Sequence, residues 1–181
     1  MSKVNVYLAD GFEEVEGLTV VDLLRRAGIE TDMVSIMGRK EITGARKIPV
    51  LADKLFEEQD DPGVIVLPGG MPGTLHLKAH AGLADLIRKA NKDGKLLAAI
   101  CAAPTIYGEM GLLEGKNATC YPGMEDKLLG ANWQEQPVVV DGNFVTSRGV
   151  GTAIAFALTL VTILKDEETA KSLANSIVYK W

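Results

Sequence analysis

Cys101 is the residue whose sequence context points most directly to chemistry. The apolar run 96–100 reads as a buried strand, and Cys101, two alanines and Pro104 follow it at the predicted start of a helix. This is the layout of a nucleophile elbow, in which a strained turn presents a reactive side chain. On composition alone, a buried cysteine is more often a small apolar core residue. Because a helix N-terminus favours thiolate, we predict a Cys101 pKa below the usual value of about 8.5, and no such lowering for Cys120.

Three carboxylates at the start of a predicted helix (13–27) are the candidates for an acid or base beside this thiol. Acidic residues in a first turn often do no more than complement the helix dipole. Helical rotation of about 100° per residue puts Glu16 roughly 60° from Glu13 and roughly 200° from Glu14. At most two of the three can therefore approach one pocket.

Gly69 and Gly70 follow a second apolar run, 64–67, and could bring backbone N–H groups close to a ligand as an oxyanion site. A plain strand-to-helix turn explains them equally well, and they match neither a dinucleotide motif nor a P-loop. His76 and His80 stand four apart on a predicted helix, 74–91, which is the spacing of a metal pair. No third ligand is evident nearby, so we favour a solvated helix face and expect no metal or organic cofactor.

The elements that must position these residues alternate between strand and helix. Short apolar or β-prone runs at 4–9, 31–36, 64–67 and 96–100 alternate with helical patterns, and two more helices are predicted at 152–164 and 166–179. Hairpins are predicted at 41–51 and around 141–143. Strands without polar alternation are buried on both faces, so the chain predicts a doubly wound, mostly parallel α/β fold in one domain, 1–181. In such folds the ligand site lies beyond the carboxyl ends of the strands.

Charge and cysteine usage exclude several classes of function. The 181 residues contain 19 Lys and Arg against 24 Asp and Glu, a net charge of −5 without a basic block, which argues against nucleic-acid binding. The two cysteines cannot form a disulfide framework. The first residues lack the features of a signal peptide, and the longest apolar-rich run, 151–164, is too short to span a bilayer. We expect a cytoplasmic protein with no membrane association.

Five segments together resemble the DJ-1/ThiJ/PfpI superfamily, and its DJ-1 branch in particular. They are residues 8–16 (LADGFEEVE), 22–28 (DLLRRAG), 66–70 (VLPGG), 98–104 (AAICAAP) and 146–152 (TSRGVGT). The resemblance implies a flavodoxin-like fold with a reactive elbow cysteine at Cys101. The acid of that family falls on Glu16, the amides of its site fall on Gly70 and Ala102, and Gly69 is expected to line the substrate site.

The resemblance also implies a homodimer. The sequence departs from the family pattern at two positions. Arg46 matches an arginine that relatives contribute across the dimer interface, and Arg26 is similar to a supporting interface residue. Tyr121 stands where many relatives have a histidine, so it is expected to donate a hydrogen bond to substrate. Val150 stands where relatives often have proline. The protease branch has a histidine directly after its cysteine, and Ala102 argues against that activity.

The leading functional hypothesis is a cysteine-dependent glyoxalase or deglycase acting on dicarbonyls such as methylglyoxal, or on their adducts. The Cys101 thiolate would attack the aldehyde carbon, and Glu16, protonated at the start, would donate to sulfur and then move protons between carbons. Gly70 and Ala102 would stabilise the oxyanion. The alternative is a peroxide-sensing stress protein or chaperone in which Cys101 oxidises to sulfinate. A ThiJ-type link to thiamine synthesis is a third reading, without a supporting thiazole- or phosphate-binding motif.

Overall fold

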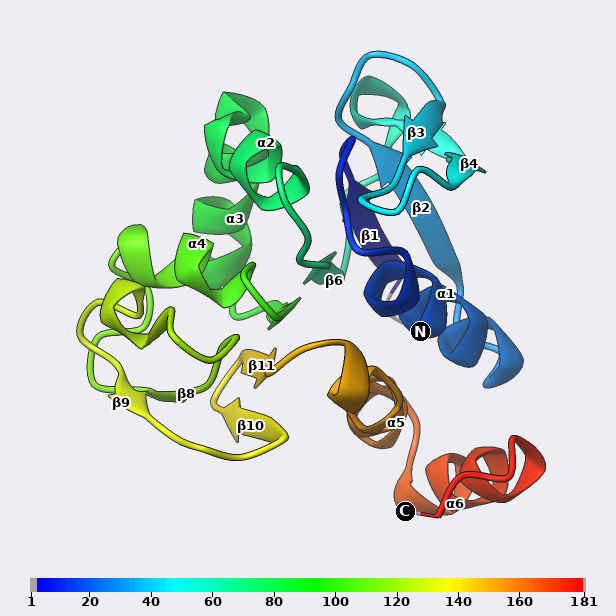
Figure 1. Cartoon of the computed structure of the whole chain (residues 1–181). Coiled ribbons are helices and arrows are strands. Elements are labelled where there is room, and N and C mark those ends of the chain that lie inside the picture. The colour runs from blue at the N-terminus through cyan, green and yellow to red at the C-terminus, as the bar shows by residue number, and fades with distance from the viewer. Residues whose placement is uncertain (1–2, 181) are drawn as a thin grey trace.

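The computed structural model describes residues 3–180, and a seven-stranded sheet of order β10-β11-β7-β6-β1-β2-β5 forms its centre (Figure 1). The strands are β1 (Val4–Leu8), β2 (Thr31–Ser35), β5 (Lys54–Leu55), β6 (Val64–Leu67), β7 (Leu96–Ile100), β10 (Val138–Asp141) and β11 (Phe144–Ser147). Every pairing is parallel except that of β10 with β11. All residues of β1 and β6 are buried, as the unbroken apolar run of β6 predicts, and in β1 the burial includes the polar Asn5. The mostly parallel α/β fold is confirmed.

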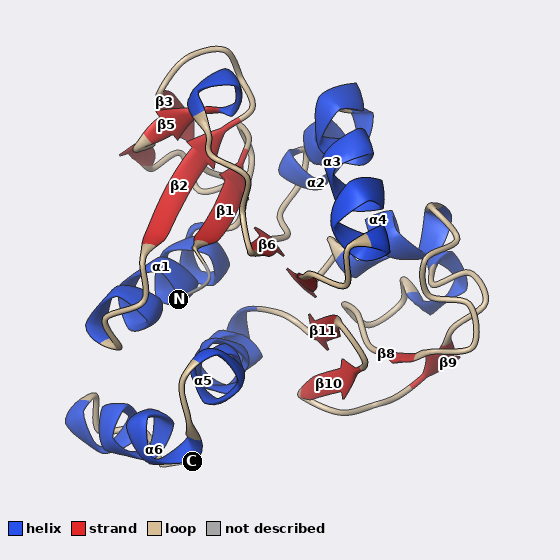
Figure 2. Ribbon diagram, turned by 180° about the vertical axis from the view of Figure 1, so that it is seen from behind, coloured by secondary structure: helices blue, strands red, loops and turns tan. Residues whose placement is uncertain are grey.

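Helices cover both faces of the sheet. They are α1 (Glu14–Arg26), α2 (Gly73–Ala79), α3 (Ala81–Lys92), α4 (Pro104–Glu109), α5 (Ala153–Leu164) and α6 (Glu167–Ser176). One core cluster joins the sheet to α1, α5 and α6, and a second joins it to α2, α3 and α4. Figure 2 shows the two groups of helices on opposite sides of the strands. This arrangement leaves the carboxyl ends of the strands for the loops that carry the candidate site.

Two helix predictions need correction. The single helix expected at 74–91 is two helices, because His80 adopts an extended conformation between them. Its Nδ1 accepts the N–H of Leu83 at 3.0 Å as an N-cap, and its ring packs on Phe56 with centroids 4.6 Å apart. His80 therefore has a structural position and is not paired with His76. The last helix ends at Ser176, three residues before the expected end.

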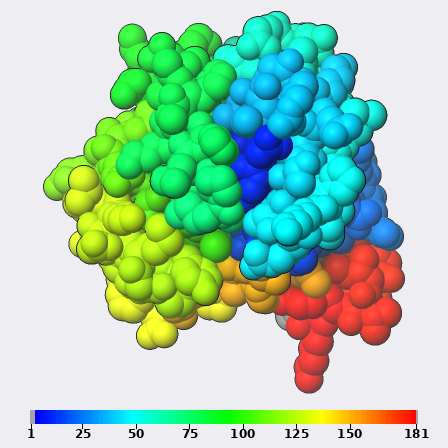
Figure 3. Space-filling view, turned by 45° about the horizontal axis from the view of Figure 1, so that its top comes forward, coloured from blue at the N-terminus to red at the C-terminus, as the bar shows by residue number. Residues whose placement is uncertain are grey.

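Short strands outside the main sheet carry the loops around the candidate site. β3 (Glu41–Thr43) and β4 (Pro49–Leu51) form the antiparallel hairpin predicted at 41–51. Figure 3 shows this hairpin (cyan) and the α2 segment (green) on either side of the N-terminal segment (blue). A parallel pair that the sequence did not reveal, β8 (Asn117–Ala118) with β9 (Asn132–Trp133), belongs to the excursion between α4 and β10.

The order of the strands reverses beside β1. The chain runs from β1 to β2 on one side and later returns to β6 on the other side of β1. Helices that leave such a point diverge to opposite faces, and the crevice between them is the usual ligand site of open α/β sheets. Here the loops after β1 and β6 carry the acidic first turn and the two glycines predicted to belong to a site.

Candidate active site

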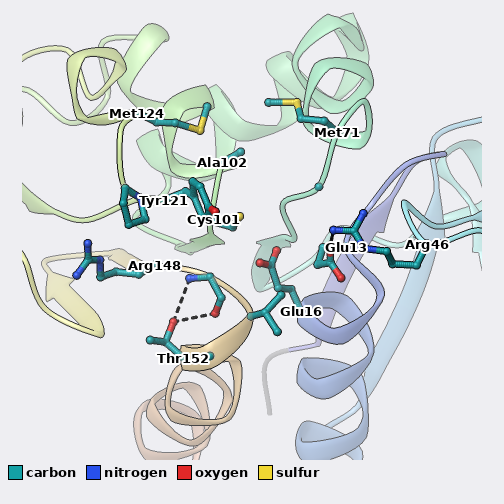
Figure 4. Close-up of a pocket in the computed structure, with 15 residues that line it drawn as sticks. Glu13, Glu16, Arg46, Met71, Cys101, Ala102, Tyr121, Met124, Arg148 and Thr152 are labelled. Carbon is teal, nitrogen blue, oxygen red and sulfur yellow. Dashed lines mark hydrogen bonds and ion pairs between the residues drawn. The ribbon is translucent and has the colours of Figure 1, made fainter.

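A cavity of about 650 Å³ lies at the carboxyl ends of the strands, where the loops after β1, β6, β7 and β11 meet. Cys101 and Glu16 both line it, as Figure 4 shows. The remaining lining residues are Glu13, Arg46, Gly70, Met71, Ala102, Tyr121, Pro122, Met124, Arg148, Gly149, Val150, Gly151 and Thr152. The structure therefore brings together segments that are far apart in the sequence, as the fold class predicts.

Cys101 has the backbone geometry of a nucleophile elbow. Its φ is +66°, in the left-handed region that residues with a Cβ seldom adopt. Two backbone hydrogen bonds hold it there: its N–H donates to Ser147 O at 3.0 Å, and its carbonyl accepts the N–H of Tyr121 at 2.7 Å. A conformation of this kind costs about 1–3 kcal/mol and persists only where the surroundings enforce it.

Glu16 is fully buried on the first turn of α1, with its carboxyl group beside the thiol. The Gly69 N–H donates to its Oε2 at 2.9 Å, whereas Oε1 is buried without a hydrogen-bond partner among residues 3–180. Burial raises the pKa of this carboxyl from 4.5 to about 7, although hydrogen bonds from Cys101 and Gly69 oppose the shift. Glu16 is thus an acid–base group poised near neutral pH, as a proton-transfer role requires.

The predicted lowering of the thiol pKa is wrong. Burial, and then the charge of Glu16, raise the pKa of Cys101 to about 12. The amides of Ala102 and Gly70 donate to the sulfur and lower the pKa, but they do not outweigh these two causes. The helix predicted after Cys101 begins at Pro104, three residues beyond the cysteine, and is six residues long, so its dipole is weak at the sulfur. Burial also raises the pKa of Cys120 to about 12, which agrees with the prediction that its pKa is not lowered.

The thiol and the carboxyl titrate as a pair. The charge of Glu16 raises the pKa of the Cys101 thiol, and a hydrogen bond from that thiol lowers the pKa of Glu16, so the steps of proton loss belong to both groups. When the pair carries one negative charge, the charge lies on Glu16 and the proton on Cys101, because the carboxyl has the lower pKa of the two. The expectation that Glu16 is protonated at the start therefore holds only below its pKa of about 7, and above it the ionised carboxyl can take the thiol proton as the sulfur attacks a substrate.

The other two carboxylates of the first turn take different positions, in agreement with the helical geometry. Glu13 lines the cavity with Glu16, and its Oε2 lies 3.6 Å from Nη2 of Arg46. Glu14 points away to the β3–β4 hairpin, where its Oε1 accepts the backbone N–H of Arg46 at 2.7 Å. Two of the three thus approach one pocket. Arg46 reaches the cavity of its own chain, and its predicted role across a dimer stays a prediction.

The four other predicted site residues lie as follows. Gly70 and Ala102 line the cavity with their amides at the sulfur, and Tyr121 lines it with a half-exposed ring. Gly69 is not among the lining residues, because its amide is engaged by Glu16 and lies behind the carboxyl. The structure thus places Gly69 against Glu16, and its expected contact with substrate stays a prediction.

Gly69→Ala is expected to damage the site through steric contact alone. A Cβ at this position would lie 2.6 Å from Cβ of Cys101, 2.8 Å from Oε2 of Glu16 and 3.0 Å from Sγ of Cys101. We expect a loss of about 1–3 kcal/mol in the free energy of unfolding, measured by chemical denaturation. Gly151→Ala is the matched control, because a Cβ there meets nothing within 4 Å. Equal stability of the two variants would contradict this account.

Sequence reasoning missed several cavity residues. Pro122 and Met124 lie in loops and carry no motif, Met71 follows the two predicted glycines but is assigned no role, and Thr152 and Arg148 belong to the segment 146–152 that the family resemblance included without assigning roles. Thr152 Oγ1 bonds to the backbone of Gly149 and shapes the turn at the cavity floor (Figure 4). From the sequence, this turn could have been placed at the site only because it follows β11, whose carboxyl end lies at the same edge of the sheet.

Residues 3–180 contain neither a candidate metal cluster nor a helix suited to spanning a membrane. No three side chains of the types His, Cys, Asp or Glu gather closely enough there to hold a metal ion. None of the helices in this range has the length and apolar character needed to cross a membrane.

Comparison with known proteins identifies relatives over most of the chain. Protein dj-1beta of Drosophila melanogaster is 37% identical over 177 residues, which are 96% of this chain and 95% of the relative. A protein named as a deglycase, from Pyrococcus abyssi, is 36% identical over 90% of this chain and 99% of its own length. Protein DJ-1 homolog B of Arabidopsis thaliana is 39% identical over 98% of this chain, but the chain spans only 42% of that relative.

Solved structures and family models agree with these relatives. The crystal structure of a cysteine-to-alanine mutant of a DJ-1 superfamily protein from Salmonella typhimurium matches with a TM-score of 0.95, at 32% identity and with 100% of both chains covered. A model of the DJ-1/PfpI family matches residues 2–163, a range that includes the cavity-lining loops and ends before α6. On the evidence of this match and of the elbow cysteine with its buried glutamate, the chain belongs to the DJ-1/PfpI family.

Proposed function

We propose that the protein is a cysteine-dependent enzyme that converts reactive 2-oxoaldehydes such as methylglyoxal to 2-hydroxy acids, or removes their adducts from proteins and nucleotides. The observation that carries the proposal is the buried pair of Cys101 and Glu16 in one cavity, with a carboxyl pKa of about 7 and a carboxyl oxygen free of partners among residues 3–180. The relative named as a deglycase supports the same class of reaction.

The chemistry follows from the positions of these groups. Glu16 takes the thiol proton while the sulfur of Cys101 attacks the aldehyde carbon, which gives a hemithioacetal whose oxyanion the amides of Gly70 and Ala102 stabilise. Glu16 returns this proton to the oxyanion and, ionised again, moves a proton from the aldehyde carbon to the neighbouring carbonyl carbon, while the hydroxyl proton of the first carbon passes to the oxygen of the second. The resulting thioester is hydrolysed by water, which releases lactate and restores the thiol. One carbon is oxidised and its neighbour reduced, so methylglyoxal and water balance lactate without another reactant.

An activity panel tests the proposal. Purified protein is given methylglyoxal, glyoxal and glycated amino acids, and lactate, glycolate and the freed amino acid are measured beside a Cys101→Ser variant. We expect product only with the wild type. If no member of the panel is converted, while mild peroxide oxidises Cys101 selectively to sulfinate, the enzyme proposal fails and the redox-sensing alternative replaces it.

We also propose that the protein works as a homodimer. Three exposed apolar side chains, Val15 on α1 and Ile48 and Leu51 at the β3–β4 hairpin, support the proposal, and the Ile48 N–H donates to Glu14 Oε1 at 3.4 Å, which ties the hairpin to α1. Exposed apolar side chains on adjoining elements are typical of an interface. Burial of this surface would place Arg46, between the hairpin strands, at the contact.

Light scattering at micromolar concentration is expected to return twice the chain mass of 19.4 kDa. Ile48→Glu should shift the mass toward that of one chain, because it buries a charge in the contact. Val140→Glu, at an exposed valine of the edge strand β10, is the control and should not change the mass. A wild-type mass of one chain would refute the dimer and leave Arg46 without a role at a partner's site.

A further inference from the structure

We propose that the cavity selects substrates in which the reacting dicarbonyl carries a neutral apolar group about the size of an aromatic ring. Aryl or long alkyl glyoxals would then be better substrates than methylglyoxal. The inference rests on the proposed function and extends it to a substrate class.

The volume of the cavity is the first observation. At about 650 Å³ it falls within the range of roughly 300–1,000 Å³ found for sites that hold drug-sized ligands. Methylglyoxal has three carbons and leaves most of this space to water. A substrate that fills the cavity needs a substituent several times larger than a methyl group.

The second observation is the apolar rim of the cavity, which we define as Met71, Tyr121, Met124 and Val150. Three of these side chains are about half exposed: Met71 at 47%, Tyr121 at 51% and Val150 at 48%. Figure 4 shows Met71 and Met124 on one side of Cys101 and Thr152 on the other. Methionine side chains adapt to irregular apolar partners, and a tyrosine ring offers a face for stacking. An apolar group above the thiol would therefore cover surface that now faces water.

The third observation concerns charge. Both arginines at the cavity are already paired within the chain, Arg46 with Glu13 at 3.6 Å and Arg148 with Glu135 at 3.2 Å. An anionic substituent would share its arginine with one of these carboxylates, and it would also lie near the carboxyl groups of Glu13 and Glu16. The pairing favours a neutral substituent.

Substrate competition tests the proposal. Phenylglyoxal reacts by the same bond changes as methylglyoxal and gives mandelate with one water. We expect its kcat/KM to exceed that of methylglyoxal by roughly tenfold or more, because burial of a ring is worth at least that factor. Phenylglyoxal with a carboxylate on the ring is the charged counterpart and should be the poorer of the two aryl substrates. A ratio of phenylglyoxal to methylglyoxal at or below one, or a preference for the charged aryl substrate, would overturn the inference.

Variants of the rim show where the preference arises. Met71→Gln and Met124→Gln keep the length of the side chain and remove its apolar character, so each should lower the ratio of the two kcat/KM values several-fold. Leu129→Gln is the control, since Leu129 is exposed at 53% and lies in the same excursion as Met124 but does not line the cavity. An equal fall of the ratio in the control would place the preference outside the rim and contradict the proposal.

A binding measurement separates this inference from the reaction itself. Acetophenone keeps the ring and one carbonyl but lacks the aldehyde, and its binding to the Cys101→Ser protein can be followed by NMR titration. Binding that Met124→Gln weakens several-fold supports the apolar site even if no dicarbonyl is turned over. Turnover of methylglyoxal without acetophenone binding leaves the proposed function intact and refutes the apolar site.

Discussion

Cys101→Ser is expected to lower kcat/KM for methylglyoxal by about a thousandfold or more. Serine preserves the size of the side chain and the elbow, but its hydroxyl is far too weak an acid to pass a proton to a carboxyl group with a pKa of about 7. The measurement is the rate of lactate formation at pH 7.5 with wild type and variant at equal concentration. Circular dichroism and the free energy of unfolding of both proteins establish that the fold is retained.

Cys120→Ala is the control for this variant. Cys120 is buried in the cluster beneath α4 and does not line the cavity, so its loss should change activity by no more than a few-fold. Substantial activity in Cys101→Ser would place the nucleophile elsewhere. A large loss in Cys120→Ala would show that the second thiol takes part in the reaction.

Glu16→Gln is expected to lower kcat/KM by roughly a hundred- to ten-thousandfold, the usual range for the loss of a general acid–base group. In the wild type the rate should rise with pH through about 7, since the ionised carboxyl is the form that accepts the thiol proton. Glutamine retains an oxygen and a donor but cannot move protons between carbons. At alkaline pH the Cys101 thiol of the variant should therefore regain its rate of alkylation by iodoacetamide, whereas the rate of turnover should stay low.

The same substitution has a thermodynamic signature that does not depend on activity. A carboxyl group with its pKa raised from 4.5 to about 7 contributes stability that is fully present below pH 4.5 and is lost as pH rises through 7. Between pH 4.5 and 8 the wild type should lose on the order of 3 kcal/mol relative to Glu16→Gln. Denaturant titrations of both proteins across this range measure the difference. Parallel stability curves would mean that Glu16 is not buried as the structure shows, and full activity in the variant would refute proton transfer by Glu16.

Much of the site could be predicted because parallel strands place their carboxyl ends at one edge. The loops that carry Glu16, Gly70 and Cys101 meet for this reason, and a rotation of 100° per residue separates Glu14 from the pocket. The break at His80 could not be predicted, because it depends on a ring that packs against Phe56, far away in the sequence.

The proton affinities could not be predicted for a related reason. Dipole arguments use the sequence next to Cys101, whereas the pKa of its thiol is decided by burial and by a carboxyl group 85 positions earlier in the chain. Of the apolar rim, Tyr121 is predicted to contact substrate and Val150 departs from the family pattern, whereas Met71 and Met124 escaped prediction because methionine usually belongs to a core. Residue type does not tell which side of a loop faces a cavity.

Because the backbone at Cys101 is left-handed, selection for stability and selection for reactivity favour different residues at this position. Glycine adopts this conformation without steric cost, so Cys101→Gly would relax the elbow while removing the sulfur. A library of variants selected only for thermal stability would then accumulate glycine at position 101, although the reaction requires the cysteine there. Persistence of cysteine there in a natural lineage accordingly records continued demand for the thiol, since folding alone would favour its replacement.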